Sequence, residues 1–117
     1  GIELVSNLNT SVKDRPQAVV VQDFALLQNY PNPFNPTTAI RYNIASPATV
    51  TLRIYNLMGQ PVRTLVHGNQ EPGLYATQWD GRLADGRNAA SGVYVYELIA
   101  KNDLETVRFT KKMVLSR

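Results

Sequence analysis

The stretch Tyr30-Pro31-Asn32-Pro33-Phe34-Asn35-Pro36 divides the chain into two parts of different character. It holds three of the seven prolines of the chain, interleaved with two asparagines and two aromatic residues. Proline fixes φ, lacks a backbone N–H and pushes the residue before it toward extended backbone. This proline strip is therefore neither a helix nor a central strand. We expect a stiff, extended segment whose rings, Tyr30 and Phe34, pack against the domain that follows.

The sequence after the proline strip alternates between apolar and polar residues, as half-buried strands do. The clearest case is Ile40-Arg41-Tyr42-Asn43-Ile44. We predict strands over residues 37–44, 49–56, 62–66, 74–79, 93–101 and 105–115. The strand over 62–66 has an imperfect period, which indicates a bulge. The one over 93–101 is apolar on both faces apart from Glu97, so it should be central. Between strands we expect a loop over 67–73 and a two-residue turn at Asn102-Asp103.

Short strands at this spacing, with turn residues between them and no helical period, predict an all-β fold. We expect a small antiparallel β-sandwich of about seven strands, built from residues 24–117. Trp79, the single tryptophan, is expected at the centre of its core. Residues 1–23 are weakly patterned and are interpreted as a linker or the tail of a preceding domain, with a short strand possible at Val19–Val21.

Charge and composition exclude several classes of protein. The net charge of +3 arises wholly from residues 101–117, which hold five Lys/Arg against two Asp/Glu. That excess is too small for a nucleic-acid footprint. No apolar run approaches the roughly 20 residues that a membrane-spanning helix needs. The chain has no cysteine, so it has neither disulfides nor a cysteine metal site.

The residue types that catalysis requires are scarce. Nucleophilic catalysis needs a base beside the nucleophile, and the only histidine, His67, falls in a predicted loop. We therefore expect no enzyme activity and no cofactor. Asp80 and Asp85 stand in two Asp-Gly dipeptides, and oxygen-rich loops with glycine suit calcium. Asp-Gly is also a common turn dipeptide, and the EF-hand pattern is missing, so two turns are the favoured interpretation.

The aromatic residues of the strands admit two interpretations. They could form a flat platform that stacks on sugar rings, which would favour a carbohydrate-binding module. At strand spacing, however, aromatic residues more often form the core or cross-strand pairs, and we favour that alternative. The residues concerned are Tyr42, Tyr55, Tyr75, Trp79, Tyr94, Tyr96 and Phe109.

Five ordered blocks between residues 24 and 117 resemble a known family. They are Phe24-x-Leu26-x-Gln28-Asn29 leading into the proline strip and Thr37-Thr38, then Val50-x-Leu52-x-Ile54-Tyr55-Asn56-Leu57-x-Gly59-Gln60-x-Val62-x-x-Leu65, Trp79-Asp80-Gly81, Ser91-Gly92-Val93-Tyr94-x-Tyr96-x-Leu98 and Lys111-Lys112-Met113-Val114-Leu115. This order resembles the C-terminal sorting domains (type A) of the bacterial type IX secretion system. It is also similar to the related Ig-like domain of flagellar hook-capping proteins.

The resemblance implies an Ig-like sandwich of seven strands at the C-terminus of a larger secreted protein, often a hydrolase. Such domains are read by the outer-membrane export machinery and are then often cut off as the cargo is anchored on the cell surface. The implied partners are therefore that machinery and the parent enzyme's domains. The alternative is a carbohydrate-binding or purely structural accessory module of a secreted hydrolase, with cell-surface polysaccharide as ligand. By likeness the structural motif positions are Tyr30, Pro31, Asn32, Pro33, Phe34, Gly59, Trp79, Gly92, Tyr94 and Tyr96.

The last strand is the segment that the resemblance implies is recognised: Lys111, Lys112, Met113, Val114 and Leu115. Successive side chains of a strand point to opposite faces, so Met113 and Leu115 should face the core. Lys111 shares their face and is expected near a frayed or bulged start. Lys112 and Val114 should point outward to a partner. At a sheet edge, the free backbone groups of this strand could also pair with another strand. The alternative is a closing strand whose lysines serve only to blunt that edge.

Overall fold

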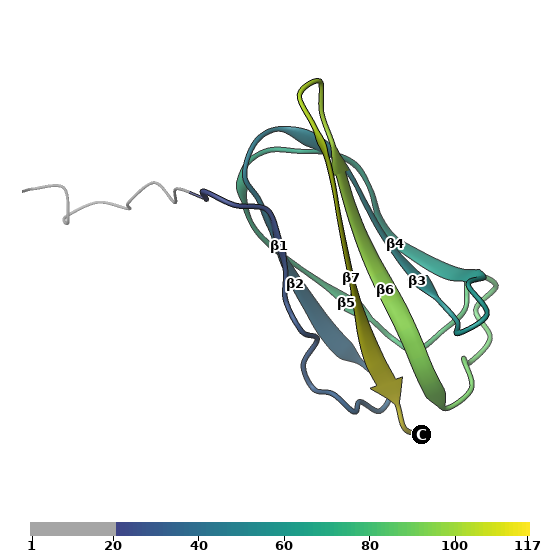
Figure 1. Ribbon diagram of the computed structural model, residues 1–117. Coiled ribbons are helices and arrows are strands. Elements are labelled where there is room, and N and C mark those ends of the chain that lie inside the picture. The colour runs from purple at the N-terminus through teal and green to yellow at the C-terminus, as the bar shows by residue number, and fades with distance from the viewer. Residues whose placement is uncertain (1–20) are drawn as a thin grey trace, which may run out of the picture.

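Residues 21–117, the part of the chain that this computed structural model describes, form two antiparallel sheets packed face to face (Figure 1). No helix occurs in this range. The seven strands are β1 (Ala25–Leu26), β2 (Thr38–Ile44), β3 (Ala48–Tyr55), β4 (Pro61–Gln70), β5 (Gly73–Trp79), β6 (Gly92–Lys101) and β7 (Thr106–Leu115). The predicted all-β sandwich is confirmed. The expected linker over 1–23 and strand at Val19–Val21 fall almost entirely outside the described residues.

The strand order places β6 inside a sheet and β7 at its edge. One sheet has the order β1-β2-β5 and the other β4-β3-β6-β7. The chain crosses between the sheets after β2, after β4 and after β5. The prediction that the 93–101 strand is central is confirmed, because β6 pairs with β3 on one side and with β7 on the other.

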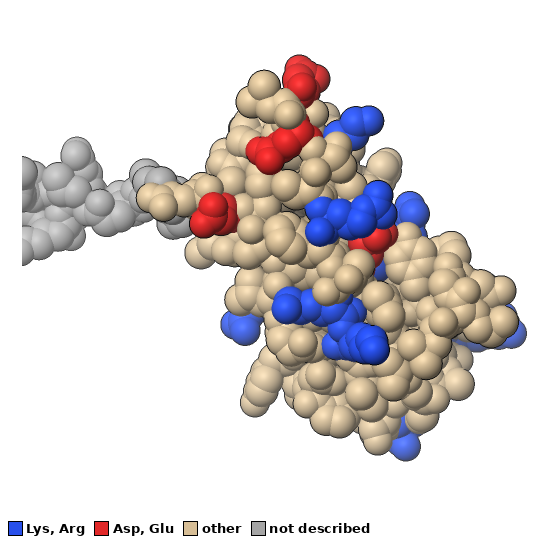
Figure 2. Space-filling model, viewed as in Figure 1, with Lys and Arg blue, Asp and Glu red and all other residues tan. Residues whose placement is uncertain are grey.

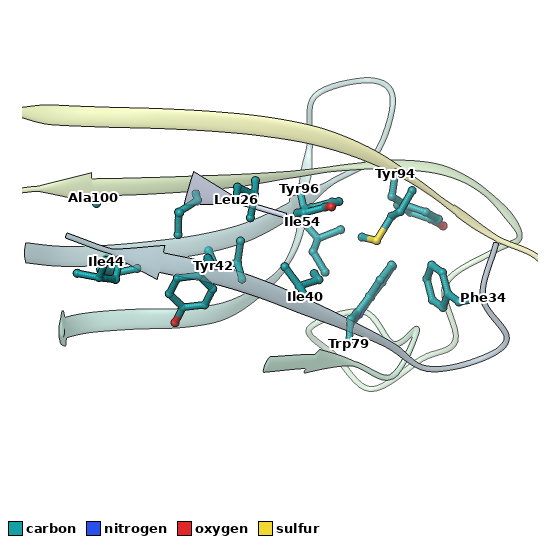
Figure 3. Packing of buried hydrophobic residues seen from close by; sticks show 14 of the residues in the cluster. Leu26, Phe34, Ile40, Tyr42, Ile44, Ile54, Trp79, Tyr94, Tyr96 and Ala100 are labelled. Carbon is teal, nitrogen blue, oxygen red and sulfur yellow. The ribbon is translucent and has the colours of Figure 1, made fainter. Parts of the chain in front are cut away.

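The core lies between the two sheets and follows the predicted alternation. Trp79 is fully buried. Its ring centroid lies 5.7 Å from that of Phe34 and 5.2 Å from that of Tyr94. Figure 3 shows these rings at one end of the core, with Tyr42, Tyr96 and aliphatic side chains along the remainder. The Trp79 indole N–H donates to the Arg82 carbonyl at 2.8 Å, so burial leaves no unpaired donor.

Strand β4 differs from the prediction because it continues through the expected loop to Gln70. Its polar residues form cross-strand pairs with β3: Thr51 Oγ1 lies 3.0 Å from His67 Nδ1, and Thr49 Oγ1 donates to Asn69 Oδ1 at 2.8 Å. An outward-facing edge strand tolerates such residues. The expected bulge is confirmed, because the β3–β4 register shifts between Leu52 and Arg53.

The β6–β7 hairpin has a four-residue connection, so the predicted two-residue turn was wrong. The strands end at the pair Lys101 and Thr106. The Asn102 N–H donates to the Glu105 carbonyl at 3.0 Å, while Asn102 Oδ1 accepts the Leu104 and Glu105 N–H groups. The asparagine side chain thus replaces the turn bonds that a tighter loop would have made.

Candidate functional site

The proline strip lies against the edge strand β7 and covers its C-terminal part. The Phe34 N–H donates to the Val114 carbonyl, and the Ser116 N–H donates to the Phe34 carbonyl, both at 2.9 Å. The Val114 N–H donates to Asn32 Oδ1 at 2.9 Å. These bonds form a short parallel bridge between Phe34 and Leu115. The backbone edge expected to be free is therefore occupied here, and we call residues 112–116 the covered half of the edge.

A buried polar network fixes the start of the proline strip. Asn29 is only 3% exposed, and its Nδ2 donates to Thr38 Oγ1 at 3.0 Å and to the Pro31 carbonyl at 3.2 Å. The Thr38 hydroxyl donates to the same carbonyl at 2.8 Å. No role for the side chains of Asn29 and Thr38 was predicted from the sequence. The available signal was a pair of short polar residues flanking the prolines, which commonly bond to nearby backbone.

Tyr96 of β6 ties the segment before the strip to the four-stranded sheet. Its hydroxyl donates to the Leu27 carbonyl at 2.8 Å and accepts the Asn29 N–H at 2.9 Å. Burial raises the pKa of the Tyr96 hydroxyl above its ordinary value, so it stays neutral and can both donate and accept. Tyr96, one of the motif positions, thus links the two sheets through the hydrogen bonds of its hydroxyl.

The two aromatic residues of the proline strip have opposite positions. Phe34 is 2% exposed, as expected, but Tyr30 is 73% exposed and does not pack against the sandwich. Tyr30 pairs with Ala39 through two backbone bonds of 2.8 and 2.9 Å. Ala39 lies between the core-facing Thr38 and Ile40, so its side chain faces outward. Tyr30, its cross-strand partner, therefore faces outward as well.

The strip is also less straight than expected. The backbone bends at residues 31–33 and again at 35–36 instead of running extended throughout. The bonds from Asn29 and Thr38 to the Pro31 carbonyl hold the first bend. The peptide bonds before Pro31, Pro33 and Pro36 are cis.

Strand β7 presents the predicted faces, with one exception. Met113 and Leu115 are buried in the core, while Lys112 is exposed and Val114 is half-buried. Lys111 does not lie at a bulge, because the β6–β7 register runs unbroken and places it opposite Tyr96. It is half-buried. An edge strand is open to solvent on one side, so a lysine on the inner face can still extend its ammonium to water.

Basic side chains gather on the face formed by β6 and β7, whereas acidic ones lie mainly toward the hairpin end (Figure 2). Arg108 forms a salt bridge of 2.9 Å with Glu97, whose other oxygen accepts the Tyr55 hydroxyl at 3.1 Å. Within residues 21–117, no carboxylate pairs with Lys111 or Lys112.

The residues after β7 are anchored in the loop between β5 and β6. The Arg117 guanidinium donates to the Ala89 carbonyl at 2.8 Å and to the Gly81 carbonyl at 2.5 Å. Gly81 has φ of 74°, and a Cβ there would lie 2.8 Å from the arginine and 2.9 Å from the Pro36 carbonyl. Only glycine fits this position, and the loop fixes the end of the edge strand.

Asp80 and Asp85, the two calcium candidates, are each engaged by an arginine. Asp80 accepts from Arg63 and from the Arg82 N–H, both at 3.1 Å. Asp85 accepts from the Arg87 backbone and guanidinium, and these bonds lower the pKa of the exposed Asp85 carboxyl. Residues 21–117 contain no group of three or more His, Cys, Asp or Glu side chains able to hold a metal. No helix in that range is long and apolar enough to cross a membrane.

The remaining motif residues divide between the edge and a distant turn. Gly92 pairs with Leu115 and Tyr94 with Met113, so both belong to the edge. Gly59 lies in the β3–β4 turn, where its N–H donates to the Asn56 carbonyl. The structure thus brings the strip, β6 and the end of β7 together and leaves Gly59 apart.

Comparison with known proteins agrees with this architecture. A family model of the FlgD Ig-like domain matches residues 34–103. The fold is similar to part of dimeric latent PorU from Porphyromonas gingivalis, with a TM-score of 0.65 and 19% identity over 77% of this chain and 9% of that one. It is also similar to FlgD from P. aeruginosa, with a TM-score of 0.55 and 22% identity over 67% of this chain and 60% of that one. No curated relative matches by sequence. The chain thus spans only part of each protein.

Proposed function

The chain belongs to the family of FlgD Ig-like domains, and from this premise we propose that residues 24–117 are a non-catalytic sorting and attachment domain of a larger secreted bacterial protein. Residues 1–23 are the linker to the parent protein. The type IX outer-membrane export machinery recognises the domain, which carries its parent through the periplasm and the outer membrane to the cell surface or the medium.

One observation carries this proposal: sequence blocks far apart in the chain meet at one edge of the sandwich. Phe34 of the proline strip bonds to Val114 and Ser116, and the β6 motif residues Tyr94 and Tyr96 pair with Met113 and Lys111. Three of the five blocks that resemble sorting domains therefore meet at a single edge of the sandwich, where Lys112 and Val114 lie on the outer face.

At this edge, the residues have different tasks. Met113 and Leu115 anchor β7 in the core, and the strip holds its backbone in place. Lys112 and Val114 face outward next to Val95 and Val93 of β6. They offer a partner one ammonium and a small apolar area on a rigid support. The recognition contact therefore comprises Lys112 and Val114, with Lys111 at the margin.

The test separates recognition from folding. We expect the double variant Lys112→Gln, Val114→Thr to retain the circular dichroism spectrum and cooperative unfolding, but to lose export of a fused reporter in a host with the type IX machinery. The control is Arg41→Gln, Ala76→Thr, which changes an exposed cross-strand pair on the opposite sheet. Export of the first variant at the control's level, with the fold intact, would refute the proposal.

The carbohydrate-binding alternative gains no support from the structure. Among the described aromatic residues, Tyr30 is the single strongly exposed one, and Trp79, Tyr42, Tyr94 and Tyr96 are buried. A stacking platform needs several coplanar exposed rings, and residues 21–117 do not present them. A non-catalytic role is supported by His67, the sole histidine, which lies exposed on β4 beside a threonine.

A further inference from the structure

The N-terminal half of the β7 edge has backbone groups that point away from the sheet. The backbone groups of Lys112, Val114 and Ser116 point away from the sheet, since they bond to Gln28, Asn32 and Phe34. Backbone direction repeats every second residue in a strand, so those of Thr106, Arg108 and Thr110 face outward too. No partner for them occurs among residues 21–117. We call residues 106–110 the open half of the edge.

A groove runs beside this open half. It has a volume of about 420 Å³ and lies between β7 and the chain just before β1. Phe24, Val107 and Phe109 supply its apolar lining and pack partly against the core. Asp23 and Glu105 stand at the hairpin end. An unpaired strand edge next to an apolar groove is the arrangement that accepts an extended peptide by strand addition.

We propose that the open half binds an extended segment of a partner protein as an added strand, with one apolar side chain in the groove and acidic residues at the end nearest Lys111 and Lys112. Backbone bonds to Thr106, Arg108 and Thr110 supply affinity, and the groove and charges supply specificity. This inference does not depend on the proposed role in export.

The charge distribution fixes the placement of this segment. Strand β7 contains Arg108, Lys111 and Lys112 and no carboxylate. Asp23 and Glu105 at the other end repel acidic residues there. At the covered half, the Gln28 side chain donates to the Lys112 carbonyl at 2.8 Å and stops further pairing. The bound strand is thus confined to a window of about five residues with acidic groups at one end.

A second copy of the domain fits this edge poorly. Antiparallel pairing of two β7 strands, centred on the open half, places Arg108 opposite Arg108. Like charges directly opposite each other destabilise a strand pair. The proline strip prevents a shift of register toward residue 116. A short pairing of this kind also buries far less than the roughly 1,200 Å² typical of stable interfaces.

The experiment uses the full chain labelled with ¹⁵N and a capped peptide of alternating valine and threonine with two glutamates at one end. Two versions carry the glutamates at opposite ends, because either chain direction can present them to Lys111 and Lys112. We expect one version to shift and protect the amides of Thr106, Arg108 and Thr110. Replacing its glutamates by lysines should weaken binding about tenfold.

A matched pair of variants tests the backbone contact. Thr110→Pro removes an N–H that faces away from β6, so the sheet keeps its ladder, and binding should fall at least about tenfold. Thr110→Val retains that N–H and should bind within about twofold of the parent. Equal binding of the glutamate and lysine peptides, or full binding by a folded Thr110→Pro, overturns the proposal.

Hydrogen exchange in the absence of peptide distinguishes the other occupants. We expect the amides of Thr106, Arg108 and Thr110 to exchange rapidly in the free chain. Protection at low concentration would show that the chain's own residues 1–20 occupy the edge. Protection that appears only at high concentration would show that a second copy does. Either result overturns the proposal. Because this measurement uses the parent chain, it remains decisive even if Thr110→Pro fails to fold.

Discussion

Phe34 is the residue through which the proline strip contributes to stability. Its ring is buried against Trp79, and its backbone bonds to Val114 of β7 and to Ser116 just after that strand. We expect Phe34→Ala to lower the free energy of unfolding by about 3–5 kcal/mol, as for other buried aromatic residues. Urea titration measures this loss of unfolding free energy. Tyr30→Ala, which removes an exposed ring of the same strip, should change it by less than about 0.5 kcal/mol. Equal effects of the two variants would mean that the strip is only a spacer.

The hydroxyl of Tyr96 holds the segment before the proline strip against β6 by hydrogen bonds. Tyr96→Phe keeps the ring but removes the hydroxyl that serves Leu27 and the buried Asn29 N–H. An unsatisfied buried donor costs about 1–3 kcal/mol, and the free energy of unfolding should fall accordingly. In the control, Tyr75→Phe, the lost hydroxyl donates to the Glu71 carbonyl at the exposed surface, so a smaller loss is expected. A Tyr96→Phe protein as stable as the parent would show that water replaces the bond.

At the level of elements, the sequence predicted what local alternation determines. Strands β2, β3, β5, β6 and β7 were found within one residue at each end, because their inner and outer faces alternate along the sequence. The end of β4 was missed, since His67-Gly68-Asn69-Gln70 has the composition of a loop and its pairing depends on Thr49 and Thr51.

The candidate site was predictable only in part, for the same reason. The inward positions of Met113 and Leu115 follow from the period of the strand itself. The cover of the strip over β7 joins residues about 80 positions apart, and local patterns hold no information about such a contact. Lys111 was expected near a frayed or bulged start, but it lies in an unbroken register, because an edge strand lets its side chain reach water.

In the loop between β5 and β6, we expect substitution of Gly81 to be more destabilising than substitution of Gly86. Gly81 and Gly86 both have positive φ, 74° and 89°, but only Gly81 has atoms within 3 Å of an added Cβ. Gly86→Ala should cost about 1–2 kcal/mol from backbone conformation alone. Gly81→Ala must also displace Arg117 or the Pro36 carbonyl, so it should lower the urea midpoint further. Equal midpoints would mean that the Arg117 anchor contributes nothing to stability.

For the whole molecule, buried tyrosines predict a loss of stability in alkali. Burial raises the pKa values of Tyr42, Tyr94 and Tyr96 above the ordinary value of about 10. The folded state therefore binds protons that the unfolded state releases. This stabilisation is complete below about pH 10 and is lost as the pH rises through the folded pKa values. Urea titrations from about pH 8 to about pH 11 should show this decline, with a shallower slope for Tyr96→Phe. A flat profile would contradict it.

The parallel bridge between Phe34 and Leu115 also determines how the domain responds to mechanical force. The described chain enters near the hairpin end, and β7 finishes at the opposite end (Figure 1). Tension between these two points pulls the strip and β7 in opposite directions along their common axis. The bonds of Phe34 with Val114 and Ser116, and of Asn32 with Val114, are then loaded together in shear rather than opened one after another. A protein tethered through this domain would therefore have to break these bonds together before the strip could leave β7.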